Sequence, residues 1–102
     1  MNIETMEANA TKHAIHDKLE SQIKTAEAKL QTLKARAEAA KADVEIKAIV
    51  DLLTRKEELH RKLQELKKSG EARWEIVKAD LVLRIATFEK AVERIEAKVK
   101  AL

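Results

Sequence analysis

The feature that most restricts the fold of this chain is the near absence of helix breakers. Its 102 residues include no proline and a single glycine, Gly70. Because proline and glycine disfavour helices most strongly, long helices can run on both sides of this point. Lys67 and Lys68 before the glycine and Glu71 after it suit the ends of two helix dipoles. The sequence therefore predicts two helices joined by a turn at residues 69–70.

The residue types at this turn also predict its conformation. Gly70 is expected to close the first helix in a left-handed conformation. Ser69 is expected to accept hydrogen bonds from the amides that open the second helix. We predict an all-α fold, with one helix over residues 11–68 and another over residues 71–101. Both belong to a single domain that covers the whole chain.

The composition favours a coiled coil over a globular core. Charged residues make up 38% of the chain and aromatic residues only 2%, which is typical of narrow seams between helices. The chain has no cysteine, so disulfides and thiolate chemistry are excluded. Basic residues are spread evenly, which argues against nucleic-acid binding. No long apolar run is present in the N-terminal segment, so we expect a cytoplasmic protein and no membrane anchor.

The apolar residues of both helices recur every three or four positions, as in a heptad repeat. In the first helix two consecutive steps of four, at Val44, Ala48 and Leu52, interrupt the repeat. Extra apolar residues lie beside this interruption, so residues 44–53 are predicted to be the most buried part of the protein. The second seam consists of Trp74, Val77, Leu81, Ile85, Phe88, Val92, Ile95, Val99 and Leu102.

The two predicted arms are unequal, and the mismatch predicts a partner. The second helix is too short to cover residues before about 36, yet that segment carries an apolar stripe, and an apolar stripe left in water indicates a missing partner. The favoured interpretation is a homodimer in which two long helices pack antiparallel. The alternative is a monomeric three-helix bundle with a bend near residues 37–43, although residues 39–43 contain no glycine or proline. The residues of this stripe, the predicted interface, are Leu19, Ile23, Leu30 and Leu33.

One segment carries side chains that bind metals. His13, His16, Asp17 and Glu20 fall within about two helical turns, and imidazole and carboxylate groups are zinc ligands. His13, His16 and Glu20 are the candidate ligands, and a dimer could bring two such sets together. The preferred interpretation is nevertheless a polar surface without a metal or cofactor. His60 is predicted to lie on the exposed face of the first helix.

No arrangement of residues predicts catalysis, so we do not expect an enzyme. The sequence favours a non-enzymatic structural or interaction protein that acts through helix–helix self-association. The alternative is an amphipathic helical protein that binds a lipid or granule surface. Trp74 bears on both, because it is expected to cap the core near the turn and would otherwise be an exposed anchor for a partner or a membrane.

Several segments resemble a family of small bacterial α-helical coiled-coil proteins of about 100 residues, described as stress-response or hypothetical proteins. The resemblance is carried by residues 18–23, 33–43 and 62–67 and by Trp74, and it covers roughly residues 18–92. It implies a stress-related role and no catalytic residues. The second helix departs from the family at Arg84, Ile85 and Phe88, where small alanine-rich positions are expected.

Overall fold

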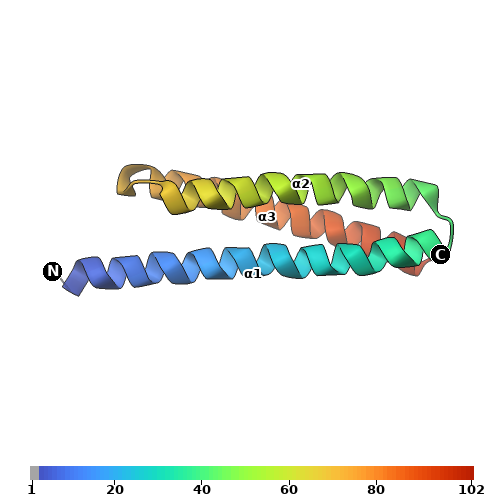
Figure 1. Ribbon diagram of the computed structural model, residues 1–102, viewed down its shortest axis with the longest axis horizontal. Coiled ribbons are helices and arrows are strands. Elements are labelled where there is room, and N and C mark those ends of the chain that lie inside the picture. The colour runs from blue at the N-terminus through green and yellow to red at the C-terminus, as the bar shows by residue number, and fades with distance from the viewer. Residues whose placement is uncertain (1–2) are drawn as a thin grey trace.

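Three helices form the chain, and each runs opposite to the one before it (Figure 1). The computed structural model describes the backbone of residues 3–102 and the side chains of residues 11–102. Helix α1 spans Ile3–Ala39, α2 spans Asp43–Lys68 and α3 spans Glu71–Lys100. No β-strand occurs within residues 3–102. The predicted all-α fold is confirmed, as a three-helix bundle.

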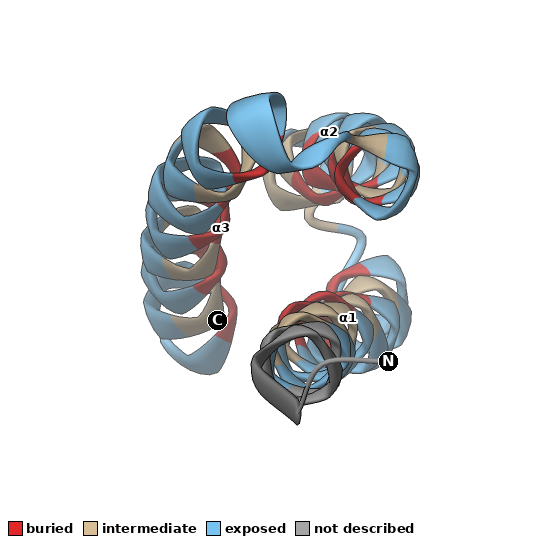
Figure 2. Cartoon of the chain, turned by 90° about the vertical axis from the view of Figure 1, so that its left-hand side faces the viewer, coloured by how far each residue is buried: buried red, intermediate tan, exposed pale blue. Residues whose placement is uncertain are grey.

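The bundle is a rod with Cα extents of 58 × 18 × 16 Å and a radius of gyration of 16.7 Å. A compact chain of this length has a radius of gyration of about 13 Å. The turn between α2 and α3 lies at the same end of the rod as the start of α1, and the C-terminus lies at the other end (Figure 1). Buried residues face inward on all three helices (Figure 2).

The continuous helix predicted over residues 11–68 is wrong, because the chain reverses at residues 40–42. The bend predicted as the alternative, near residues 37–43, is confirmed. Helices α1, α2 and α3 contain 37, 26 and 30 residues, so the chain folds back on itself before the α2–α3 turn is reached.

This reversal has the hydrogen bonds of a Schellman motif, which normally ends on glycine. The amide of Ala42 donates to the carbonyl of Ala37 over 2.9 Å, and the amide of Lys41 donates to the carbonyl of Glu38 over 3.0 Å. Lys41 takes the left-handed conformation, with φ of 55°. Ala42 also packs against the core. A turn of this kind without glycine gives no signal that a search for helix breakers can find.

The second turn lies at residues 69–70 as predicted, but its details differ. Gly70 is extended, with φ of −72° and ψ of 167°, and precedes α3 without a side-chain cap. The Ser69 hydroxyl donates to the Glu65 carbonyl over 2.7 Å. The left-handed glycine and the serine cap predicted for this turn are therefore wrong, because an extended pair of residues suffices to start α3.

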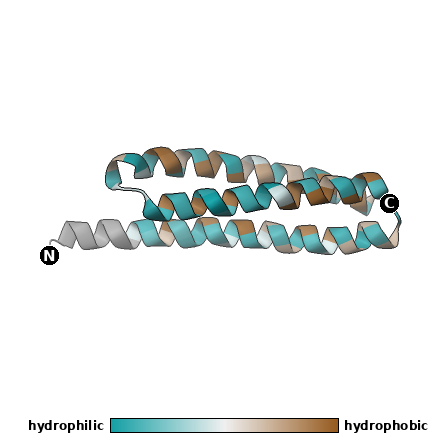
Figure 3. Ribbon diagram, turned by 45° about the horizontal axis from the view of Figure 1, so that its top comes forward, coloured by the Kyte–Doolittle hydropathy of each residue, from teal (hydrophilic) through white to brown (hydrophobic). Residues whose placement is uncertain are grey.

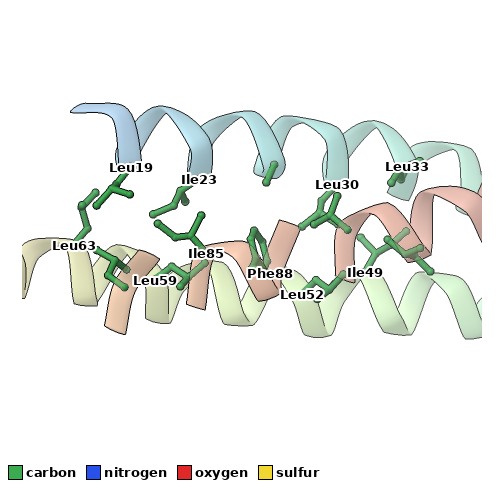
Figure 4. Packing of buried hydrophobic residues seen from close by; sticks show 14 of the residues in the cluster. Leu19, Ile23, Leu30, Leu33, Ile49, Leu52, Leu59, Leu63, Ile85 and Phe88 are labelled. Atoms are coloured by element: carbon green, nitrogen blue, oxygen red, sulfur yellow. The ribbon is translucent and has the colours of Figure 1, made fainter. Parts of the chain in front are cut away.

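The predicted interface lies on α1, and this α1 stripe is buried inside the chain, against α2 and α3 (Figure 4). All four of its residues are at most 5% exposed, and Leu30 is fully enclosed. The stripe therefore needs no second copy to cover it, and the reason for a dimer through these residues is removed. Hydrophobic residues recur at regular intervals along each helix, with hydrophilic ones between them (Figure 3).

The interrupted repeat predicted for residues 44–53 is wrong. The core positions of α2 keep steps of three and four throughout, at Ile49, Leu52, Lys56, Leu59, Leu63 and Leu66. Val44 is 79% exposed, so this segment is not the most buried part of the protein. The seam predicted for α3 is confirmed from Trp74 to Val99, while Leu102 at its end is exposed.

Lys56 occupies a core position of this repeat, with its side chain only 11% exposed. Its Nζ lies 2.9 Å from Oε1 of Glu57 and 3.3 Å from Oε1 of Glu27 on α1. The hydrogen bond to Glu57 raises the pKa of Lys56, and the one to Glu27 adds to it, whereas burial acts in the opposite direction. The charge is thus kept at the seam by two carboxylates.

Replacing Lys41 with glycine tests the left-handed turn. A left-handed conformation costs an L-residue roughly 1–2 kcal/mol, and glycine adopts it freely at a smaller cost in chain entropy. We expect Lys41→Gly to raise the free energy of unfolding by about 0.5–1 kcal/mol in urea denaturation. The control Lys47→Gly, inside α2, should lower it by about 1 kcal/mol. Equal destabilisation by both substitutions would contradict the turn.

Replacing Lys56 with methionine tests the charged core position. Methionine keeps the apolar stem of lysine at this core position, and the carboxylates that lose their partner, Glu27 and Glu57, are 32% and 68% exposed and stay hydrated. We therefore expect Lys56→Met to unfold at an equal or higher urea concentration.

The pH dependence of stability gives a second check on Lys56. Its raised pKa stabilises the folded state fully below the unfolded pKa of about 10.4, and this contribution is lost as pH rises through the folded pKa. Wild type should therefore lose more stability than Lys56→Met above about pH 10. Parallel pH profiles of the two proteins would exclude this role.

Candidate functional site

Two surface features stand out, one between α2 and α3 and one on α1 near the α2–α3 turn. The first is a groove of about 780 Å³ between α2 and α3, called here the α2–α3 groove. Its floor is apolar and includes the core residues Leu59 and Phe88. Leu83 lines the same groove from α3, and 68% of this residue is exposed. A large aliphatic side chain at the rim of an apolar groove is a feature of surfaces that bind other helices.

Charged side chains of both signs border the α2–α3 groove. Along α2 the sign alternates with each turn, and on α3 Arg84 Nε donates a hydrogen bond to Asp80 Oδ2 over 2.8 Å. Within α2, Lys62 Nζ lies 3.6 Å from Oε2 of Glu65. The rim is therefore neither an acidic nor a basic patch. The bordering charged residues are Arg55, Glu58, Arg61, Lys62, Glu65, Asp80 and Arg84.

The second feature, the histidine cluster, consists of His13, His16, Asp17 and Glu20 on α1. The Asp17 carboxylate lies between the two imidazoles: its Oδ2 is 3.3 Å from His13 Nε2, and its Oδ1 is 3.7 Å from His16 Nδ1. His16 Nδ1 is also 3.9 Å from Glu20 Oε2. These residues line a cavity of about 500 Å³ near the α2–α3 turn. The three residues predicted as metal-ligand candidates are thus brought together with Asp17.

His16 is the most enclosed member of the histidine cluster, with its side chain 15% exposed. Its Nε2 is buried and has no hydrogen-bond partner. The pKa of Glu20 is lowered, first by its hydrogen bond to Lys24, whose Nζ is 3.0 Å from Oε1, and further by the charges of His16 and His60. Glu20 is therefore a carboxylate at neutral pH.

His60 was misplaced by the sequence prediction. It lies on α2, is half-buried and acts electrostatically on Glu20 of α1. The approach of His60 to Glu20 depends on the reversal at residues 40–42, so the prediction of one continuous helix could not include it.

Trp74 caps the core, as predicted from the sequence. It also lies close to the histidine cluster. The residue is buried, and it lines the same cavity as His16. The Nζ atoms of Lys12 and Lys78 lie 5.3 Å and 5.0 Å from the centroid of its ring, within the range of cation–π attraction. Lys12 also pairs with Glu71 over 3.5 Å, which ties α1 to the start of α3.

Comparison with known proteins finds no match: no protein-family model, no curated protein and no solved structure is significantly similar to this chain. The family resemblance therefore stays a prediction. None of the helices in residues 3–102 carries the long apolar stretch that crossing a membrane requires.

Removing Lys12 tests the packing around Trp74. The substitution Lys12→Ala deletes one cation–π contact and the pair with Glu71, so the free energy of unfolding should fall by about 0.5–1 kcal/mol. The emission of Trp74, the only tryptophan, should shift to longer wavelength as water reaches the ring. Lys47→Ala, on the outer face of α2, is the matched control and should leave the emission unchanged. Identical spectra for all three proteins would contradict this contact.

Proposed function

We propose that this chain is a non-enzymatic interaction protein that binds a second copy of itself through the α2–α3 groove. The observation that carries the proposal is the apolar floor of the groove together with the exposure of Leu83 at its rim. A second copy laid against this groove, α2 on α2 and α3 on α3, buries the exposed leucine of each copy between the packed helices. The α1 stripe takes no part, since it is buried within one chain.

The charges along α2 support a second copy as the occupant. In an antiparallel arrangement with a two-fold axis near residue 60, Arg55 of one copy meets Glu65 of the other. The same axis brings Glu58 opposite Lys62. Both pairs have opposite signs, and a two-fold axis forms each of them twice. The rim of the groove is thus complementary to itself.

The charges on α3 follow the same rule. A two-fold axis near residue 82 brings Asp80 of one copy opposite Arg84 of the other, so the existing pair within each helix can be exchanged for two pairs between copies. A nucleic acid or an anionic membrane is recognised by a surface of one sign. The alternating signs around this groove favour neither, and they favour a partner with the same alternation.

The role is helix-to-helix docking without chemistry. A stress-related role and a cytoplasmic location, which the resemblance and the composition predict, stay predictions. The lipid- or granule-binding alternative uses the same exposed leucine and is an outcome of the experiments that follow.

The first experiment is the mass of the protein in solution, measured by light scattering over a dilution series. We expect twice the 11.6 kDa of one chain at high concentration. The substitution Leu83→Glu should weaken association roughly tenfold or more, because a carboxylate is placed against the apolar floor. The control Val44→Glu changes an equally exposed residue outside the groove and should leave the mass unchanged. A mass of one chain at every concentration would refute the proposal.

A charge exchange identifies the second copy as the occupant. Arg55→Glu should weaken the dimer, and adding Glu65→Arg in the same chain should restore it. Ten residues of helix separate the two positions by about 15 Å, so they do not meet within one copy. Failure of the double variant to recover the dimer would rule out the antiparallel arrangement.

Flotation with vesicles of anionic phospholipid tests the alternative that the protein binds a lipid surface. We expect the protein to stay at the bottom of the gradient. Co-migration that Leu83→Glu abolishes, in a protein that stays monomeric, would replace self-association by lipid binding.

A further inference from the structure

The histidine cluster takes no part in the proposed docking, and its geometry resembles that of a metal site. One ligand atom from each of His16, Asp17 and Glu20 lies within 4.8 Å of the others, which identifies these three as a possible ion-binding group among the described residues. The atoms come from adjacent turns of α1, a helix that holds them in place. We propose that these three residues bind a divalent transition-metal ion such as Zn²⁺.

The separations of the ligand atoms are close to those a bound ion requires. Zinc bonds to nitrogen and oxygen are about 2.0–2.2 Å long, so two ligands of a tetrahedral ion lie about 3.4 Å apart. His16 Nδ1 is 3.7 Å from Asp17 Oδ1 and 3.9 Å from Glu20 Oε2. Small rotations of exposed or half-buried side chains close the difference, with no change in the helix.

The orientation of the His16 ring determines which of its two nitrogens can bind an ion. Nε2 is enclosed by protein and makes no hydrogen bond, so only Nδ1 can reach an ion from outside. Nδ1 faces both carboxylates, and this is where the ion would sit.

The ligand types select the class of ion. Imidazole nitrogen with two carboxylates suits zinc, cobalt and nickel, whereas magnesium and calcium prefer ligand sets made only of oxygen. Lys24 pairs with Oε1 of Glu20, and Oε2 is the oxygen that lies toward His16 Nδ1. Three lysines oppose a positive ion: Lys24 through this pair, and Lys12 and Lys67 as lining residues of the cavity.

All three ligands come from α1, and water would complete the coordination of the ion. His60 of α2 acts electrostatically on Glu20 but is not part of this group. His13 stands on the far side of Asp17, 3.3 Å from Oδ2, where it orients that carboxylate.

The test is calorimetric titration of the full chain with zinc chloride. We expect one saturable site per chain. His16→Gln should abolish the heat of binding, and Asp17→Asn should weaken binding roughly tenfold or more. Asp17 is exposed, so its replacement leaves the core intact. The control Glu38→Gln removes an exposed carboxylate near the far end of α1 and should bind as wild type does.

Two further measurements keep the result unambiguous. Copper(II) bound at His16 should quench the fluorescence of Trp74, which lines the same cavity, and His16→Gln should remove the quenching. Zinc should raise the melting temperature of wild type, since an ion that binds only the folded state stabilises it, and His16→Gln should remove this shift. Circular dichroism of each variant checks that the helices are retained.

The proposal fails if zinc gives no saturable heat, or if His16→Gln and Asp17→Asn bind zinc as wild type does. Either result is independent of the mass measured for Leu83→Glu, because the two sites share no residue.

Discussion

The burial of the α1 stripe is the interaction on which the rest of the structure depends. If α1 and α2 formed one continuous helix, α3 would fold back along α2 only and would leave the leucines and isoleucines of α1 exposed. Reversal at residues 40–42 brings α2 alongside α1, and α3 then closes the third side. Each buried leucine or isoleucine contributes about 1.5–3 kcal/mol relative to full exposure. That total far exceeds the roughly 1–2 kcal/mol that a left-handed Lys41 costs.

This balance explains which parts of the fold could be predicted from sequence. The seam of α3 could be predicted because its apolar residues repeat without a gap. The α2–α3 turn could be predicted because glycine marks it, although Gly70 is extended rather than left-handed. The reversal at Lys41 could not be chosen over a continuous helix, since its Schellman motif carries no glycine and its stability comes from distant contacts. Local propensity was overridden by packing between helices.

The incorrect prediction of the apolar seam of α2 had a different cause. Apolar residues alone trace its seam incorrectly, because Lys56 stands at a core position and breaks the apolar count. The repeat of the preceding segment was also continued through the reversal at residues 40–42, which led to Val44 and Ala48; the first is exposed and the second only partly buried. The candidate site shows the same effect: His13, His16 and Glu20 are neighbours along one helix and were identified, whereas His60 comes near Glu20 only after the chain has folded back.

Lys56 also connects the fold to the histidine cluster. Its pair with Glu27 fixes how α1 and α2 lie alongside each other. One heptad along from that pair, Glu20 lies level with Leu63, one turn from His60. A slip of one heptad that brings Lys56 beside Lys34 instead of Glu27 would replace an ion pair with two like charges, and it would carry His60 away from Glu20. The opposite slip would bring Lys56 beside Glu20, so Lys56 disfavours only the first of the two. A charged residue in a core seam is known to select register at some cost in stability. The register in which Lys56 meets Glu27 is also the one in which the charge of His60 acts on Glu20.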